Sequence, residues 1–150
     1  MKAIQITAFG GPDVMKYVDL ADPVAGTDEV VLDVTAVGIN YADTHQTENS
    51  YLSPQTLPMI PGIEVVGTHD GKRYLASVSS GGYAQKAIAH KSVLFPIPDA
   101  VTDQQALCML VQGATAWHLL KTMGKLQKGQ SVVVHAAAGG VGTIAIQLAK

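Results

Sequence analysis

Apolar and polar residues alternate along several short stretches of the first hundred residues. The clearest is Glu29 to Val37, where every second residue from Val30 to Ala36 is apolar, the period of a half-buried strand. The polar segment 39–50 predicts a loop with a short helical turn. Further strands are expected at residues 2–8, 15–20, 63–68, 73–78 and 83–89, separated by turns rich in Gly, Pro and Asp. Together they predict an all-β unit, a small barrel or sandwich.

Beyond residue 98 the spacing of apolar residues becomes helical. The segment Thr102–Gln105 fits a capping box, in which the threonine hydroxyl caps a helix and the glutamine reaches back. A second helical face is expected from Ala116 to Met123. Within these helices we expect Trp117, Met123 and the single cysteine, Cys108, to be core residues.

The last twenty residues predict a strand, a glycine turn and a helix. A β-branched run at Val132–Val134 is followed by the glycines of 139–142 and then by a helical apolar face from Val141 to Leu148. In such a turn the backbone N–H groups and the helix N-terminus can face a pyrophosphate, which makes it a candidate dinucleotide site. The alternative is a glycine turn that only packs the helix against the strand.

Composition narrows the functional classes. The 150 residues are 47% hydrophobic and 15% charged, which is typical of a globular chain, and the net charge of −2 offers no footprint for nucleic acid or an anionic membrane. One cysteine excludes an internal disulfide and a cysteine cluster for zinc. The first ten residues lack the long apolar core that a signal peptide would have, and no apolar run reaches membrane-spanning length. We therefore expect a cytoplasmic protein with a small, uncharged partner, and neither a nucleic-acid nor a membrane partner.

Five motifs follow one another along the chain: VGINYAD at 37–43, LPMIPGIEVVG at 57–67, GGYAQ at 81–85, QGATAWHLL at 112–120 and HAAAGGVGTIAIQLAK at 135–150. In this order they resemble the medium-chain dehydrogenase/reductase family, specifically the N-terminal part of its zinc-free NADPH:quinone oxidoreductase branch. The resemblance implies a GroES-like β-barrel domain at residues 1–100, with a helical bridge and the first β-α unit of a truncated Rossmann nucleotide-binding domain at 101–150.

The zinc-dependent members of that family differ from this chain at the metal site. They carry a Cys-His pair where this chain has Asn40 and Tyr41, and a GHE motif where it has Gly62–Glu64. Zinc requires several converging nitrogen or sulfur ligands, so we expect no bound metal. The alternative is a site made by His45, Glu64 and a distant third ligand.

Two residues are predicted to be catalytic. The resemblance places Asn40 and Tyr51 on the nicotinamide side of the cleft, with His45 where relatives often have a tyrosine. An amide and a phenol can each hydrogen-bond a developing oxyanion or a ribose. The alternatives are that Asn40 satisfies the backbone of a turn and that Tyr51 is a packing aromatic.

The resemblance also predicts the cofactor site. It implies that Thr115 faces the nicotinamide, although an ordinary polar residue near a helix start is the alternative. The expected cofactor is NADPH. NADH is the alternative, because the residue that usually discriminates the two cofactors lies about 20 positions beyond the glycine turn, after Lys150. The cofactor-binding turn is expected to comprise Ala138, Gly139, Gly140, Val141 and Gly142.

The predicted function is hydride transfer from NAD(P)H to a quinone or another conjugated carbonyl, such as an enone. We expect the reaction to need no zinc and the protein to be a homodimer. The alternatives are an alkenal or enoyl reductase of the same family and a non-catalytic nucleotide-binding module. The final helix reaches Lys150 without a glycine, asparagine or proline stop signal. We therefore expect this sequence to be part of a longer protein, and its 150 residues alone neither to catalyse hydride transfer nor to bind dinucleotide tightly.

Overall fold

The computed structural model describes all 150 residues, and their contacts divide the chain into two compact units. The N-terminal unit is Met1–Leu107 and the C-terminal unit is Cys108–Lys150. The division lies inside helix α2 (Asp103–Cys108) rather than after residue 100. The assignment of these units as a catalytic domain and the start of a nucleotide-binding domain stays a prediction.

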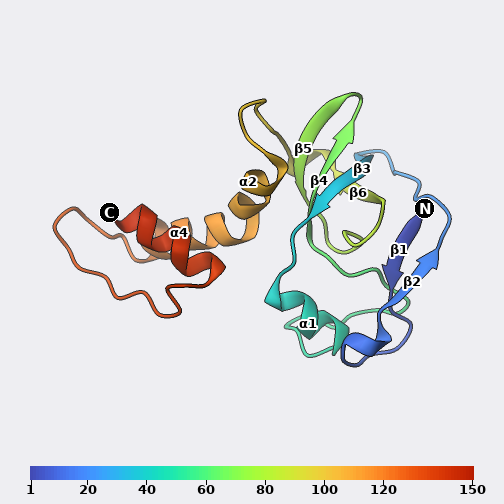
Figure 1. The fold of residues 1–150 in the computed structure, drawn as a ribbon, viewed down its shortest axis with the longest axis horizontal. Helices are drawn as coiled ribbons and strands as arrows, with labels where there is room; N and C mark the ends of the chain where they lie inside the picture. The colour runs from blue at the N-terminus through green and yellow to red at the C-terminus, as the bar shows by residue number, and fades with distance from the viewer. The chain divides into compact units, whose positions relative to one another are not determined.

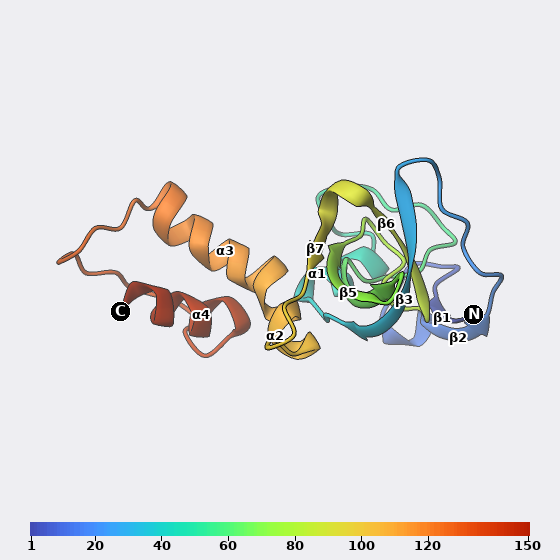
Figure 2. The same cartoon turned by 90° about the horizontal axis from the view of Figure 1, so that it is seen from above.

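A curled antiparallel sheet of five strands forms the N-terminal unit (Figures 1 and 2). Its spatial order is β6-β3-β4-β5-β7, and β1 and β2 form a separate antiparallel pair. The strands are β1 (Lys2–Gln5), β2 (Lys16–Asp19), β3 (Glu29–Val37), β4 (Glu64–His69), β5 (Lys72–Ser77), β6 (Lys86–His90) and β7 (Leu94–Pro96).

The sheet buries the residues that the alternation assigns to its inner face. Leu32 of β3 and Val65 of β4 are fully buried, and Ala76 of β5 and Ala87 of β6 pack into the same cluster. Successive side chains of a strand point to opposite faces, so the period-two pattern of β3 is the direct cause of this core. The prediction of a strand at Glu29–Val37 is confirmed at both ends.

The strand β7 was not predicted from the sequence. It has three residues, pairs only with β5 and ends on Pro96. A three-residue edge strand has too few positions to show a period, and proline is tolerated there because no partner needs its N–H.

A tight turn joins β4 to β5. Asp70 and Gly71 both have positive φ, at 48° and 72°, and the flanking residues His69 and Lys72 pair with each other. Two positive φ values are typical of a type I′ turn, whose twist matches that of a two-stranded hairpin.

Short helices complete the N-terminal unit. They are η1 (Pro12–Val14), α1 (Tyr41–Thr47), η2 (Lys91–Val93) and α2 (Asp103–Cys108). The predicted helical turn within 39–50 is α1. The capping box at the start of α2 is confirmed, because the Gln105 N–H donates to Thr102 Oγ1 at 3.2 Å and the Thr102 N–H donates to Gln105 Oε1 at 2.9 Å.

The C-terminal unit is helical. Two of its segments, η3 (Met109–Gly113) and η4 (His118–Met123), are π-helical. None of the helices in the chain is long and apolar enough to cross a membrane. Its small core joins Ala116 and Leu120 to Ala145, with Val141, Ile144 and Leu148 packed against it, as the predicted helical faces require. The elements are η3 (Met109–Gly113), α3 (Ala114–Trp117), η4 (His118–Met123) and α4 (Gly140–Ala149).

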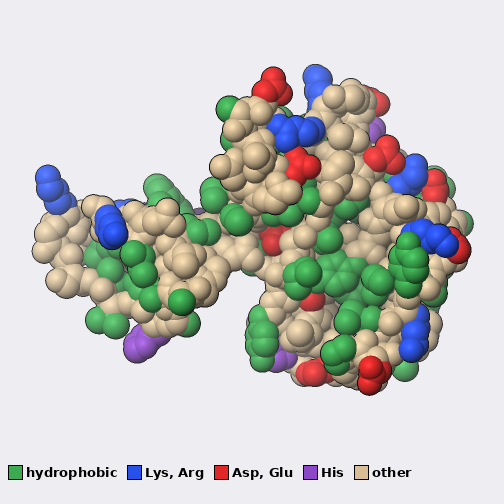
Figure 3. Space-filling model, viewed as in Figure 1, with side chains coloured by type: hydrophobic (Ala, Val, Ile, Leu, Met, Phe, Trp, Pro, Cys, Tyr) green, Lys and Arg blue, Asp and Glu red, His purple; other side chains and the backbone are tan.

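Four sequence predictions are wrong in this unit. Residues 131–135 form no strand, because a strand needs a neighbour for its hydrogen bonds and the C-terminal unit contains none. Trp117 and Met123 are 51% and 76% exposed rather than in the core, and Cys108 is exposed as well. Hydrophobic side chains accordingly reach the surface in both units (Figure 3).

Candidate active site

Asn40 precedes α1 and is held in the protein interior. Its N–H donates to Asp43 Oδ2 at 2.7 Å, the reciprocal half of a capping box, and the residue is only 7% exposed. Its side-chain amide donates to Glu64 Oε1 at 2.9 Å. The capping role matches the structural alternative that the sequence left open for Asn40, and its catalytic role stays a prediction.

Glu64, at the start of β4, is a carboxylate inside the sheet. It is 1% exposed, and its bond to the Asn40 amide compensates part of the cost of burying a charged group. The Gly38 N–H donates to the Glu64 backbone carbonyl at 3.1 Å, which ties the segment before α1 to the same strand.

Tyr83, which is half-buried, extends the hydrogen bonds of these buried residues. Its hydroxyl donates to Asp43 Oδ2 at 2.6 Å, the oxygen that already accepts from the Asn40 backbone. Burial raises the pKa of the Tyr83 phenol well above its usual value, and the hydrogen bond to Asp43 raises it further. We call Asn40, Asp43, Glu64 and Tyr83 the Asp43 network.

Tyr51 borders a pocket of about 530 Å³, which we call the Tyr51 pocket. The tyrosine is 41% exposed, so its phenol is accessible. Asn40 is not among the lining residues, and the pocket therefore brings together only one of the two predicted catalytic side chains. Most of the lining is polar and the remainder is apolar: Gln46, Tyr51, Ser53, Pro54, Gln55, Thr56, Met59, Ile63, Ser77, Val78, Ser79 and Ser80.

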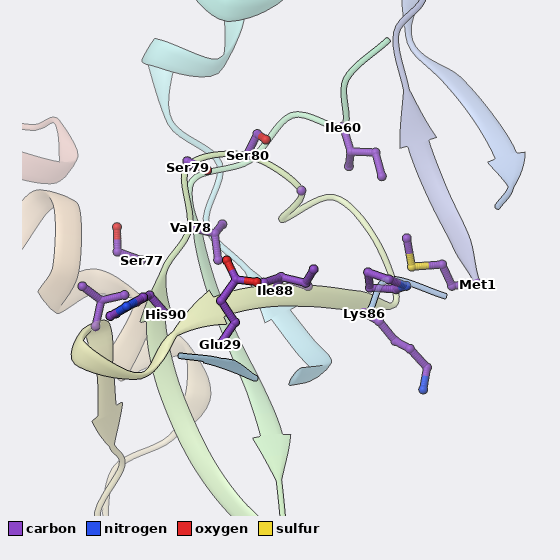
Figure 4. A pocket seen from close by; sticks show the side chains of 14 residues that line it. Met1, Glu29, Ile60, Ser77, Val78, Ser79, Ser80, Lys86, Ile88 and His90 are labelled. Atoms are coloured by element: carbon purple, nitrogen blue, oxygen red, sulfur yellow. The ribbon is translucent and has the colours of Figure 1, made fainter. Parts of the chain in front are cut away.

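A second pocket, of about 610 Å³, shares the lining residues 77–80 with the Tyr51 pocket (Figure 4). It contains none of the predicted site residues. Glu29 and Lys86 are charged residues of its lining, but Lys86 is paired with Asp22 at 3.3 Å and with Asp33 at 3.2 Å. The positive charge of Lys86 is therefore neutralised by these two carboxylates.

No group of three or more His, Cys, Asp or Glu side chains lies close enough to share a metal ion. His45, the ligand of the alternative metal site, pairs its Nδ1 with Ser50 Oγ at 2.9 Å. Ile63, which stands where the zinc-dependent relatives have the histidine of GHE, lines the Tyr51 pocket as an apolar side chain. The donor set present at this place is thus unsuited to zinc.

The glycine turn in the C-terminal unit has the steric character of a dinucleotide fingerprint. A Cβ on Gly142 would lie 2.3 Å from the Ala136 carbonyl oxygen and 2.7 Å from Ala137 Cα, so only glycine allows α4 to approach the preceding segment this closely. Ala138, Gly139 and Gly140 are exposed, while Val141 is half-buried. The first N–H groups of a helix have no intrahelical acceptor, so the N-terminus of α4 can bind an anion.

Gln112 packs over this turn. A Cβ on Gly140 would lie 3.0 Å from Gln112 Cγ, which brings η3 and the start of α4 into contact within the C-terminal unit. Thr115, one turn further along, is exposed on α3, and its proposed contact with a nicotinamide stays a prediction.

Sequence reasoning missed Asp43, Gln46, Tyr83 and Gln112 as neighbours of the site. One signal was available: Asn40 followed three residues later by Asp43 is the pattern of a capping box, which would have placed both residues at a helix start. The contact of Asp43 with Tyr83 spans 40 positions, and no local pattern predicts it.

Comparison with known proteins identifies relatives along the whole chain. Residues 26–71 match the model of the alcohol dehydrogenase GroES-like domain. The chain is 34% identical to the quinone oxidoreductase of Lama guanicoe and 32% identical to that of Homo sapiens, with all of this chain and 49% and 50% of those proteins covered. It therefore spans about half the length of the curated relatives it matches.

Solved structures give the same result. The quinone oxidoreductase of Thermus thermophilus is 41% identical with a TM-score of 0.92, covering 99% of this chain and 50% of that one. The human synaptic vesicle membrane protein VAT-1 homolog-like protein is 28% identical with a TM-score of 0.94, covering 99% and 52%. The predicted fold class is thereby confirmed, although strand 131–135 is not formed. The chain belongs to the medium-chain dehydrogenase/reductase family and is similar to about half the length of the family's quinone oxidoreductases.

Proposed function

We propose that the protein carrying this chain is an NADPH-dependent, zinc-independent oxidoreductase that reduces a quinone or another conjugated carbonyl. The observation that carries the proposal is the glycine turn at Gly139–Gly142, built so that α4 approaches the preceding segment where a Cβ would clash. Its relatives support the chemistry, since they are quinone oxidoreductases, and the Thermus thermophilus enzyme was crystallised with NADPH.

The residues of the turn fit a dinucleotide. Ala138, Gly139 and Gly140 are exposed and small, so a pyrophosphate can reach the backbone at the N-terminus of α4. Thr143 directs its hydroxyl to the Gly139 carbonyl at 3.0 Å and to the Gly140 carbonyl at 3.1 Å, which stabilises the turn. NADPH, when bound, supplies the hydride.

The Tyr51 pocket is the proposed acceptor site. Its volume of about 530 Å³ suits a small organic molecule, and Ile63 and Met59 give it apolar surface for a ring. Tyr51 carries a phenol that can donate a hydrogen bond to a carbonyl oxygen as negative charge develops there. Asn40 keeps its amide at Glu64 and acts by fixing the backbone at the start of α1.

The side chains at the position of the zinc ligands in the zinc-dependent members support the proposed zinc independence. Asn40 and Ile63 replace the relatives' ligands, and the carboxylate of Glu64 accepts a hydrogen bond from Asn40. We expect well under one zinc per chain by elemental analysis after purification without chelator. Stoichiometric zinc, with activity lost on chelation, would refute this part of the proposal.

Steady-state assays of the protein carrying this chain test the reaction. NADPH oxidation is measured with a simple quinone and, separately, with a simple enone. We expect turnover with the quinone; turnover with the enone alone would assign the protein to the alkenal or enoyl reductases instead. Saturable NADPH binding without turnover on either acceptor would make the chain part of a non-catalytic nucleotide-binding module.

Dissociation constants for NADPH and NADH test the cofactor. We expect NADPH to bind more tightly, as the likeness to the NADPH-bound relative suggests. Tighter binding of NADH would contradict this preference and leave the glycine turn as the site. The homodimeric state and the cytoplasmic location stay predictions, which sedimentation and cell fractionation can check.

A further inference from the structure

The GGYAQ motif at residues 81–85 carries Tyr83, whose hydroxyl donates to Asp43 of α1. We propose that Tyr83 is a positioning residue: through Asp43 it holds α1 in place and thereby fixes the wall of the Tyr51 pocket that α1 supplies. The inference rests on the proposed function, because it assigns a residue that shapes the acceptor site.

Two donors converge on one oxygen of Asp43. Oδ2 accepts from the Tyr83 hydroxyl at 2.6 Å and from the Asn40 N–H at 2.7 Å, while Oδ1 is buried without a hydrogen-bond partner. Hydrogen bonds to a carboxylate are stronger than those between neutral groups. A carboxylate that relies on two donors loses half of them when the Tyr83 hydroxyl is removed.

Tyr83 is itself rigidly held and can serve as an anchor. Its N–H donates to the Pro61 carbonyl at 2.9 Å, and its own carbonyl accepts from the Ile4 N–H at 2.8 Å. Its ring lies against Gly62, where φ is +95° and a Cβ would be 2.6 Å from a ring carbon. The ring therefore occupies space that only a glycine leaves open.

Helix α1 carries the effect from Asp43 to the pocket. Gln46 follows Asp43 by three positions, which places the two side chains on the same face of the helix. Gln46 is buried and lines the Tyr51 pocket, and its Oε1 has no hydrogen-bond partner that would hold it there. Its position consequently depends on how firmly the start of α1 is held.

The glycine turn belongs to the C-terminal unit, whereas every contact of Tyr83 described above lies in the N-terminal unit. Loss of the Tyr83 hydroxyl should therefore weaken acceptor binding and leave cofactor binding unchanged. A purely structural role would instead lower stability without this selectivity.

Tyr83→Phe tests the inference, with Tyr74→Phe as the matched control. Tyr74 is a half-buried tyrosine of β5 that packs on the sheet core, and its hydroxyl makes no hydrogen bond. Amide hydrogen exchange of residues 41–48 is measured on the 150-residue chain. The KM values for quinone and NADPH are measured on the protein carrying it.

In Tyr83→Phe we expect faster exchange in α1 and a rise in the quinone KM on the order of tenfold, with the NADPH KM unchanged. Tyr74→Phe should match the wild type in all three readouts. Unchanged exchange in α1, or faster exchange with an unchanged quinone KM, would overturn the inference. If the wild type shows no turnover, the proposed function fails, and the exchange measurement alone then decides whether Tyr83 holds α1.

Discussion

The two units differ in how much of their apolar surface the chain itself covers. In the N-terminal unit Leu32 and Val65 are fully buried inside the curled sheet, whereas in the C-terminal unit Val133 is 81% exposed. Burial of apolar area is the main favourable term in folding, at about 25 cal/mol per Å². The N-terminal unit should therefore supply most of the stability of the chain.

The contrast also separates local from non-local structure. The turn at Gly139–Gly142 and helix α4 form in the C-terminal unit, because a helix makes its hydrogen bonds within its own segment. The valine run at 132–134 forms no strand, because it needs a neighbour that this unit lacks. The glycine turn can thus form, with no room for a Cβ at Gly142, without a strand beside it.

Truncation of one apolar side chain in each unit gives the largest expected contrast. Leu32→Ala removes a fully buried side chain and should lower the free energy of unfolding by about 2–5 kcal/mol. Val133→Ala should change it by less than about 0.5 kcal/mol, because the side chain is exposed. Urea denaturation followed by circular dichroism measures both. Equal losses in the two variants would show that the valine run is buried in solution and would break the comparison.

Substitution of the third glycine of the turn tests whether the C-terminal unit holds the cofactor. Gly142→Ala places a Cβ 2.3 Å from the Ala136 carbonyl oxygen, so α4 must move away from that segment. We expect NADPH to bind about tenfold to a hundredfold more weakly, measured by calorimetry on the protein carrying this chain.

Gly11→Ala is the control for this substitution, because nothing lies within 4 Å of the added Cβ. It should bind NADPH like the wild type. An unchanged NADPH dissociation constant in Gly142→Ala would mean that the cofactor does not use this turn.

Sequence predicted the parts of the fold that depend on neighbouring positions in the chain. Strand β3, the capping box at Thr102 and the apolar face of α4 each follow from a period or a local pattern, and each is confirmed. The strand at 131–135 was mispredicted because β-branched residues indicate strand propensity but do not supply a partner.

The candidate site was less predictable for the same reason. Tyr51 could be named from family resemblance, and it does line a pocket. The bonds from Asp43 to Tyr83 and from Asn40 to Glu64 join residues 40 and 24 positions apart, so they become visible only when the sheet brings β4, α1 and the GGYAQ loop together.

A charged contact at the end of the N-terminal unit should have a smaller effect than the Leu32 truncation. Asp103 accepts from Thr35 Oγ1 at 2.7 Å and from Arg73 at 2.7 Å, and both hydrogen bonds hold the pKa of its carboxyl below the usual value, Thr35 more strongly. A depressed pKa contributes stability above the pKa of the unfolded chain, and this is lost as the pH falls through the folded value.

Asp103→Asn should therefore destabilise the chain by about 1–2 kcal/mol at pH 7. The difference from the wild type should shrink below about pH 4, the range in which unfolded Asp residues are protonated. Urea denaturation at pH 7 and pH 3 measures this, with exposed Asp99→Asn as the control expected to have no effect. If Asp103→Asn lowers the free energy of unfolding as much at pH 3 as at pH 7, the loss is steric rather than electrostatic.

Cys108 gives the smallest expected effect and tests the exposed character of the C-terminal unit directly. The sequence places this thiol on an apolar helix face, but the structure exposes it at the first residue of the unit. An exposed thiol reacts as its thiolate without prior unfolding, so the native 150-residue chain should titrate one thiol with a disulfide reagent as fast as the urea-unfolded chain does. Cys108→Ser should abolish the reaction and change the free energy of unfolding by less than about 0.5 kcal/mol, since no packing is lost. A thiol that reacts only after unfolding, together with a destabilised serine variant, would mean that Cys108 is buried and that the C-terminal unit covers more apolar surface than its contacts indicate.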